Sequence, residues 1–258
     1  MTATRLTASL SVALLLLIAV ACANPLARKQ YRCTLSGQSE PATAYQYVER
    51  GFAHIRLDQF ECAFGACSEA IRLDPKLALG YSCRGTLWLQ QDNFSRALTD
   101  FNQALQIEPN NGDLYNSRAK LYRRLDEDAP ALADLNKAVV LITSEFGRST
   151  AYAARAEIFT KEGKLDEAMK DYDQAIRLAP SFAYYYEARG NLSSKRGNFE
   201  HAIADYTEAI RLDPKNQYFY TDREQAYRQL GKTQEASMDA DAAVTLTSEK
   251  SAAEGQPH

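Results

Sequence analysis

The chain has 258 residues, and its 30 Lys and Arg nearly balance its 33 Asp and Glu, which leaves a formal net charge of −3. Because no basic cluster is present, binding to nucleic acid through phosphate neutralisation is not expected. Only three histidines occur, and the sequence has no nucleophile elbow, phosphate loop or HExxH motif. We therefore expect a non-enzymatic protein with no cofactor and no metal site.

Residues 1–23 have the three-part plan of a secretory signal peptide: a basic residue, an apolar run over residues 10–20, and small residues near a cleavage point. The apolar run is shorter than the about 20 residues that a membrane-spanning helix needs. Cleavage after Ala23 would release a soluble product. Cleavage after Ala21 would expose Cys22, in a stretch that looks like a bacterial lipoprotein box. We expect export to the periplasm or out of the cell, and both outcomes for Cys22, lipid-anchored or removed, stay open.

Residues 24–43 form a leading segment, and four cysteines follow the signal peptide: Cys33, Cys62, Cys67 and Cys83. In an oxidising compartment, four cysteines allow three disulfide pairings. Cys62 and Cys67 lie five positions apart on one predicted helix, which disfavours a bond between them. The favoured arrangement is Cys33–Cys62 with Cys67–Cys83, and the alternative is four free, packed thiols.

One pattern then recurs six times. Alanine, a second alanine seven residues later, arginine and tyrosine all return at spacings of 34, 34, 37, 34 and 34 residues. The first alanines are Ala63, Ala97, Ala131, Ala168, Ala202 and Ala236. Such self-similarity identifies an array of one repeated unit. The predicted repeats cover residues 44–77, 78–111, 112–148, 149–182, 183–216 and 217–247, and residues 248–258 are predicted to be a disordered tail.

Each repeat predicts a helical hairpin, because apolar residues recur every three or four positions on both sides of a central turn. In the fifth repeat Gly197 marks the turn, and Pro214 stops the second helix. Three extra residues lie between Leu141 and Tyr152. We expect this insertion to lengthen the loop between two repeats without disturbing either helix.

The fifth repeat carries an aromatic residue, a small residue, alanine, a second aromatic residue, alanine and proline at Tyr186, Gly190, Ala202, Tyr206, Ala209 and Pro214. This pattern resembles the tetratricopeptide-repeat (TPR) family, over about residues 44–247. The resemblance implies an all-α fold, an α-solenoid in the form of a right-handed superhelix of about six helix–turn–helix repeats. The third repeat departs from the pattern with Asp126-Glu127-Asp128 in place of the glycine turn. The sixth has Ala240 at the second aromatic position, which suits a solvent-facing end repeat.

The resemblance also implies that the first helices line a concave groove for an extended or helical peptide. The predicted groove residues are a tyrosine rim, a polar middle and a basic edge: Tyr45, Tyr184 and Tyr218; Asn116, Lys120 and Asn191; and Arg123, Arg124, Lys161 and Lys195. A tyrosine rim beside a basic row predicts a peptide with acidic side chains. The alternative is an ordinary solvated helix face.

Arginine occupies one first-helix position in all six repeats, and aspartate repeats on the second helix in five of them. These residues could form a cationic row for acidic ligands. Their shared spacing favours instead a pair between each arginine and the aspartate of the neighbouring helix. We interpret both ladders as part of the scaffold.

The most consistent function is an exported bacterial scaffold that brings proteins together in the cell envelope. One alternative is a structural module that assembles end to end with itself. Another is a eukaryotic secretory-pathway co-chaperone, in which the sequons at Asn93 and Asn191 would carry glycans.

Overall fold

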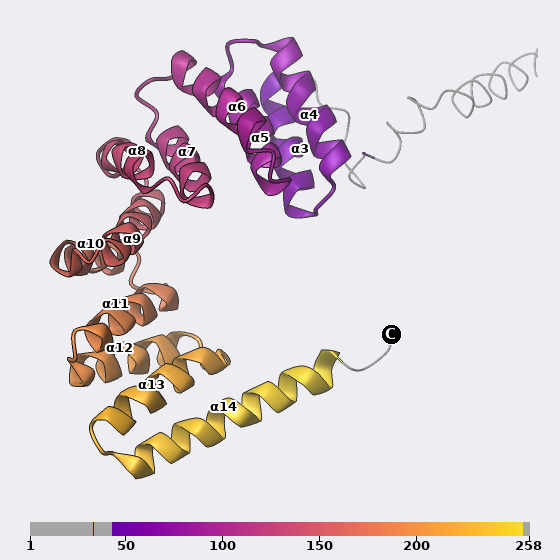
Figure 1. Ribbon diagram of the computed structural model, residues 1–258. Helices are drawn as coiled ribbons and strands as arrows, with labels where there is room; N and C mark the ends of the chain where they lie inside the picture. The colour runs from indigo at the N-terminus through magenta and orange to yellow at the C-terminus, as the bar shows by residue number, and fades with distance from the viewer. Residues whose placement is uncertain (1–32, 34–42, 255–258) are drawn as a thin grey trace, which may run out of the picture. The chain divides into compact units, whose positions relative to one another are not determined.

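The computed structural model describes Cys33 and residues 43–254, and every regular element among them is an α-helix (Figure 1). The chain divides into two compact units at residues 107 and 108. The predicted all-α solenoid of helical hairpins is confirmed, while the handedness of its superhelix stays a prediction. The predicted signal peptide with Cys22, most of the leading segment and residues 255–258 lie outside the described residues.

The first unit holds two hairpins, built from α3 (Ala44–Arg56), α4 (Phe60–Leu73), α5 (Ala78–Gln90) and α6 (Phe94–Ile107). The second unit holds four, built from α7 (Gly112–Arg124), α8 (Asp128–Leu141), α9 (Glu145–Lys161), α10 (Leu165–Leu178), α11 (Ala183–Lys195), α12 (Phe199–Leu212), α13 (Gln217–Gln229) and α14 (Thr233–Glu254). Within each unit, the second helix of one hairpin packs against the first helix of the next. None of the helices described is both long enough and apolar enough to cross a membrane.

Every hairpin turns at a residue in the left-handed backbone conformation. These residues are Asp58, Asp92, Asp126, Gly163, Gly197 and Gly231, with φ of 53°, 56°, 60°, 76°, 77° and 70°. Glycine adopts this conformation freely, and aspartate tolerates it because its short side chain can hydrogen-bond locally. Asp126 therefore makes the same turn as the glycines, although its repeat departs from the glycine pattern in sequence.

The helices approach closely where a small residue faces a bulky one. A Cβ atom added to Gly85 would lie 2.9 Å from the ring of Phe101, and one added to Gly190 would lie 2.7 Å from the ring of Tyr206. In the first hairpin, a Cβ atom added to Gly51 would lie 2.7 Å from Cys67 Sγ and 2.6 Å from Cys83 Sγ. The Cys67–Cys83 disulfide thus fills the space that an aromatic ring fills in other repeats.

Both favoured disulfide pairs are present in the first unit. The Sγ atoms of Cys33 and Cys62 lie 2.10 Å apart, and those of Cys67 and Cys83 lie 2.05 Å apart. The first bond fixes Cys33 to α4, where the Cys33 carbonyl lies 3.0 Å from Nε2 of buried His54. The second bond joins α4 to α5, so that it links two successive hairpins.

The arginine and aspartate ladders pair as their spacing predicts. In each pair, Nε and Nη2 of arginine donate to the two carboxylate oxygens of aspartate over 2.6–2.9 Å. The pairs are Arg84–Asp100, Arg118–Asp134, Arg155–Asp171, Arg189–Asp205 and Arg223–Asp239. In the first hairpin Ala66 stands at the aspartate position. The ladders therefore clamp the two helices of a hairpin and belong to the scaffold.

The three-residue insertion lies between Leu141 and Tyr152 as predicted, but the expectation that it lengthens a loop is wrong. The extra residues extend α9 at its start, so that the helix begins at Glu145 and has 17 residues. The side chain of Ser144 caps this helix by accepting a hydrogen bond from the Gly147 amide over 3.2 Å. Three residues form nearly one helical turn, so the insertion lengthens α9 by about one turn. The added turn brings Phe146 against Phe182, with ring centroids 6.0 Å apart.

The predicted disordered tail is wrong for residues 248–254. Helix α14 continues without interruption from Thr233 to Glu254 and has 22 residues. Its last residues include Ala, Glu and Lys, which favour helix, and contain neither glycine nor proline. Thr247 Oγ1 also donates to Gln217 Oε1 over 2.7 Å, which ties this part of α14 to α13.

We expect Asp100→Ala to destabilise the first unit by about 2–3 kcal/mol, because it leaves the Arg84 guanidinium without its carboxylate in a half-buried site. The double variant Arg84→Met/Asp100→Leu should cost clearly less than the sum of the two single changes. Urea unfolding followed by circular dichroism measures these losses. Glu69→Ala, which removes the exposed partner of Arg72 on α4, is the control and should have a much smaller effect. Additive losses at Arg84 and Asp100 would contradict a coupled pair.

Candidate functional site

Seven of the ten predicted groove residues line two pockets in the second unit. The α7–α9 pocket, of about 430 Å³, contains Lys120, Arg123, Arg124 and Lys161 together with Asp126, Asp128, Glu157 and Ile158. The α9–α11 pocket, of about 300 Å³, contains Tyr184, Asn191 and Lys195 together with Thr160, Tyr172, Glu187, Ala188 and Leu192. Asn116 lies one turn before Lys120 on α7, Tyr218 lies exposed on α13, and Tyr45 lies exposed on α3 of the first unit.

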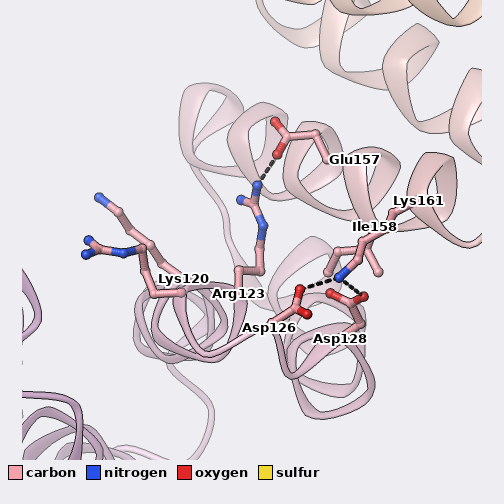
Figure 2. A pocket seen from close by; sticks show the side chains of 8 residues that line it. Lys120, Arg123, Asp126, Asp128, Glu157, Ile158 and Lys161 are labelled. Atoms are coloured by element: carbon pink, nitrogen blue, oxygen red, sulfur yellow. Dashed lines mark hydrogen bonds and ion pairs between the residues drawn. The ribbon is translucent and has the colours of Figure 1, made fainter. Parts of the chain in front are cut away.

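The basic edge of the α7–α9 pocket is partly neutralised. Arg123 forms an ion pair with Glu157, and Lys161 forms ion pairs with Asp126 and with Asp128, the latter at 2.6 Å (Figure 2). The hydrogen bonds that the Lys161 ammonium group donates to Asp126 and Asp128 raise the pKa of Lys161. The sequence predicted a row of available cations here, but these two side chains already have carboxylate partners within the chain.

Lys120 differs from its neighbours in this pocket. It is exposed and points away from the ion pairs of Arg123 and Lys161 (Figure 2). Lys120 precedes Arg123 by three residues on α7, and it takes no part in the ion pairs that Arg123 and Lys161 form with Glu157, Asp126 and Asp128.

Glu157 joins the two pockets. One of its carboxylate oxygens pairs with Arg123, and the other accepts a hydrogen bond from the Tyr184 hydroxyl over 2.6 Å. The α9–α11 pocket contains further polar contacts: the Tyr206 hydroxyl donates to Asn191 Oδ1 over 2.7 Å, and Lys195 Nζ donates to the Thr160 carbonyl over 3.4 Å. The first helices α7, α9 and α11 thus contribute one continuous row of polar and aromatic side chains.

Glu187 and Asp222 are two carboxylates that the sequence did not predict as groove residues, and they lie toward the α11 end of the row. Burial raises the pKa of Glu187 on α11, and the charge of Asp222 on α13 raises it further. Burial also raises the pKa of Asp222. The sequence offers one indication that Glu187 could belong to the groove, because it occupies the same register as Asn116. That it comes close to Asp222 of the next first helix depends on how the helices pack.

Three tyrosines in or beside the α9–α11 pocket remain neutral hydrogen-bonding groups. Burial raises the pKa of Tyr172, Tyr184 and Tyr206 well above the ordinary value for a phenol. In the part of the chain that the structure describes, no three His, Cys, Asp or Glu side chains are placed to hold a metal ion. The row can therefore contact a ligand through hydrogen bonds, ion pairs and aromatic surface.

Three stretches of the chain match family profiles. Residues 78–111 and 183–216 match profiles described as "Tetratricopeptide repeat", and residues 156–195 match one described as "TPR repeat". The first two stretches have the same bounds as the second and fifth predicted repeats. Among proteins of curated function, no sequence matches the chain.

Several solved structures share the fold. PilF from Pseudomonas aeruginosa is 15% identical, with a TM-score of 0.70 over 83% of this chain and 93% of that one. PilW, described as a type IV pilus biogenesis factor, is 18% identical, with a TM-score of 0.69 over 76% and 90% of the two chains. YrrB, described as a TPR protein with an unusual peptide-binding site, is 23% identical, with a TM-score of 0.53 over 68% and 89%. At these identities the similarity shows the fold alone.

We expect Glu187→Gln to stabilise the protein at neutral pH by up to about 0.5 kcal/mol, because it removes an ionised carboxylate from a half-buried position. The raised pKa of Glu187 means that the folded chain favours the protonated form. The ionised carboxylate therefore lowers stability above the folded pKa, and the advantage of the glutamine variant should vanish as the pH falls below the unfolded pKa.

Urea unfolding of the original chain and the variant across this pH range measures the difference. Glu249→Gln in the interior of α14 changes an exposed glutamate outside both pockets and should leave stability nearly unchanged. A less stable Glu187→Gln variant at neutral pH would mean that the carboxylate stabilises the fold.

Proposed function

Because the chain is a tetratricopeptide-repeat protein, we propose that it is a non-enzymatic scaffold for protein–protein interaction and that it binds a peptide segment of its partner along α7, α9 and α11. The observation that carries this proposal is the row of two adjacent pockets on successive first helices, joined at Glu157. A peptide that crosses several first helices would meet hydrogen-bonding groups and aromatic surface at each of them.

The exposed aromatic side chains of the second unit support this binding mode. Tyr184 is 42% exposed at the α9–α11 pocket, and Tyr218 is 63% exposed on α13. Tyrosine offers a large contact area with few rotatable bonds, so that ordering it on binding costs little entropy. The peptide-binding site named in the description of YrrB is consistent with this use of the fold.

We further propose that the protein is exported to the cell envelope. The signal-like plan of residues 1–23 supports export, and so do the two disulfides of the first unit, since disulfides persist in oxidising compartments. Contact with a membrane would then come only through a lipid on Cys22. PilF and PilW share the fold, but at their low identity the chain's own partner and pathway do not follow from them.

End-to-end self-assembly is less well supported. In the fifth repeat, Phe199, Ile203 and Tyr206 on α12 pack in a cluster that includes Ala226 of the next hairpin. The sixth repeat has Thr233, Ser237 and Ala240 at the same positions of α14. These smaller or more polar residues give a following hairpin little apolar surface, as expected for a capping repeat.

The secretory-pathway alternative depends on glycosylation. Asn191 lies in the α9–α11 pocket with its Oδ1 accepting from Tyr206, so a glycan on this residue would occupy the proposed binding row. An occupied Asn191 would therefore favour that alternative and count against a peptide in this pocket.

Groove-directed substitutions test the proposed binding row. Phage-displayed random dodecapeptides selected on the oxidised full chain serve as the probe. Tyr184→Ala removes aromatic contact area and Lys120→Trp fills the α7–α9 pocket. Each should weaken selected peptides by about tenfold or more, as measured by fluorescence anisotropy.

Matched substitutions outside the pockets are the controls. Phe64→Ala removes an aromatic side chain that is 40% exposed on α4, and Lys170→Trp changes an exposed lysine on α10. Both should retain peptide affinity. Equal affinity of all four variants would place peptide binding elsewhere on the molecule.

Mass spectrometry of the protein from its native host tests export. The mature chain should begin at Cys22 with a lipid adduct, or at Asn24 without one. Its non-reduced mass should also correspond to two disulfides. A chain that keeps Met1 and has all five cysteines as free thiols would contradict export.

A further inference from the structure

We propose that the α9–α11 pocket receives a cationic side chain, arginine or lysine, of the bound peptide, held by the Glu187 carboxylate beside the ring of Tyr184. This inference rests on the proposed peptide-binding function and reverses the charge preference that the sequence predicted for this part of the groove. It deepens that function by assigning one residue class to one pocket.

The geometry of α11 places the required groups together. Tyr184, Glu187 and Asn191 are spaced by three and four residues, so they form one stripe on the helix surface. All three line the same pocket, and Tyr172 of α10 contributes a second ring to it. The pocket therefore combines a carboxylate, an amide and two aromatic rings, which together can bind a guanidinium or ammonium group.

The cationic side chains near Glu187 either contact other groups of the chain or lie farther along α11. Arg123 is paired with Glu157. Lys195 lies eight residues beyond Glu187, on the order of 12 Å along the helix axis, and its ammonium group contacts the Thr160 carbonyl. In contrast, neither Glu187 nor Asp222 forms an ion pair with another described residue. Glu187 thus lines the pocket without an ion-pair partner of its own, and the charge of Asp222 on α13 adds to the negative potential around it.

The carboxylates of this region also raise the pKa values of nearby phenols, after the larger effect of burial. After burial, the largest influences that raise the pKa of Tyr206 are the charges of Asp222 and Glu187. The hydrogen bond and charge of Glu157 act in the same direction on Tyr184. A carboxylate from a partner would add to this repulsion, whereas a cation would relieve it.

The scaffold itself shows that tyrosine rings of this chain accept cations. The guanidinium of Arg189 lies 5.9 Å from the ring centroid of Tyr186, and Arg155 lies 5.5 Å from that of Tyr152. Both distances fall within the range of about 6 Å in which a cation is attracted to the face of an aromatic ring. A partner cation at Tyr184 would use the same attraction with Glu187 as its counter-charge.

The selected dodecapeptide pool described above provides the test. On the original chain, the enriched peptides should contain several-fold more Arg and Lys than the starting library. Glu187→Gln should remove this enrichment, and Glu187→Lys should shift it to Asp and Glu. Glu200→Gln, on the exposed face of α12, is the matched control and should keep the original preference.

A double-substitution cycle then assigns the contact. Replacing the conserved cation of a selected peptide with norleucine should weaken binding to the original chain by about tenfold. The same replacement should change binding to the Glu187→Gln variant by less than about twofold. Circular dichroism of each variant verifies that it is folded.

The outcomes separate this inference from the function on which it rests. Strong peptide selection that favours acidic residues, or that shows no charge preference, would overturn the cation pocket and leave the peptide groove intact. Equal losses from norleucine on the original chain and on Glu187→Gln would also overturn it, because the cation would then bind elsewhere. A chain that selects no peptide at all would contradict both the groove and the pocket.

Discussion

The fold depends on a steric constraint: two helices can approach closely only where one of them presents almost no side chain to a bulky group on the other. At Gly85 and Gly190 that group is an aromatic ring, and at Gly51 it is the Cys67–Cys83 disulfide. The same ring of Tyr206 packs in a cluster with Ala226 of the next hairpin. A single pairing of small and large residues therefore holds a hairpin together and also positions its neighbour.

This constraint separates the scaffold positions from the polar positions of the proposed binding row. The small residues, rings and arginine–aspartate pairs must recur in nearly every repeat, because each hairpin has the same packing to satisfy. The polar side chains that line the two pockets have no such packing role, so they differ from one repeat to the next. Glu187 and Asn116, for example, share a register but carry different chemistry. Under the proposed function, selectivity for a ligand would come from these non-recurring positions.

Helix packing also decides which charged side chains of the row have partners within the chain. Lys161 and Arg123 count as cations in the sequence, yet carboxylates that the fold brings near them supply their partners. Glu187 and Asp222 instead meet across two first helices in a half-buried position, where the ionised form is disfavoured. An ionised carboxylate at such a position lowers the stability of the folded protein.

Periodicity alone determined the helical hairpins, their number, the turns at Gly163 and Gly197 and the arginine–aspartate pairing, because these features repeat and follow from local spacing. The repeat spacing placed the insertion, but it did not show that the extra residues extend α9 behind a serine cap, nor that α14 continues past residue 247. The left-handed turn at Asp126 was also missed, because glycine is the usual residue at such a turn. The carboxylates beside Lys161 and the effect of Asp222 on Glu187 arise between residues on different helices, and only the packing of the hairpins decides which of these side chains come within reach of one another.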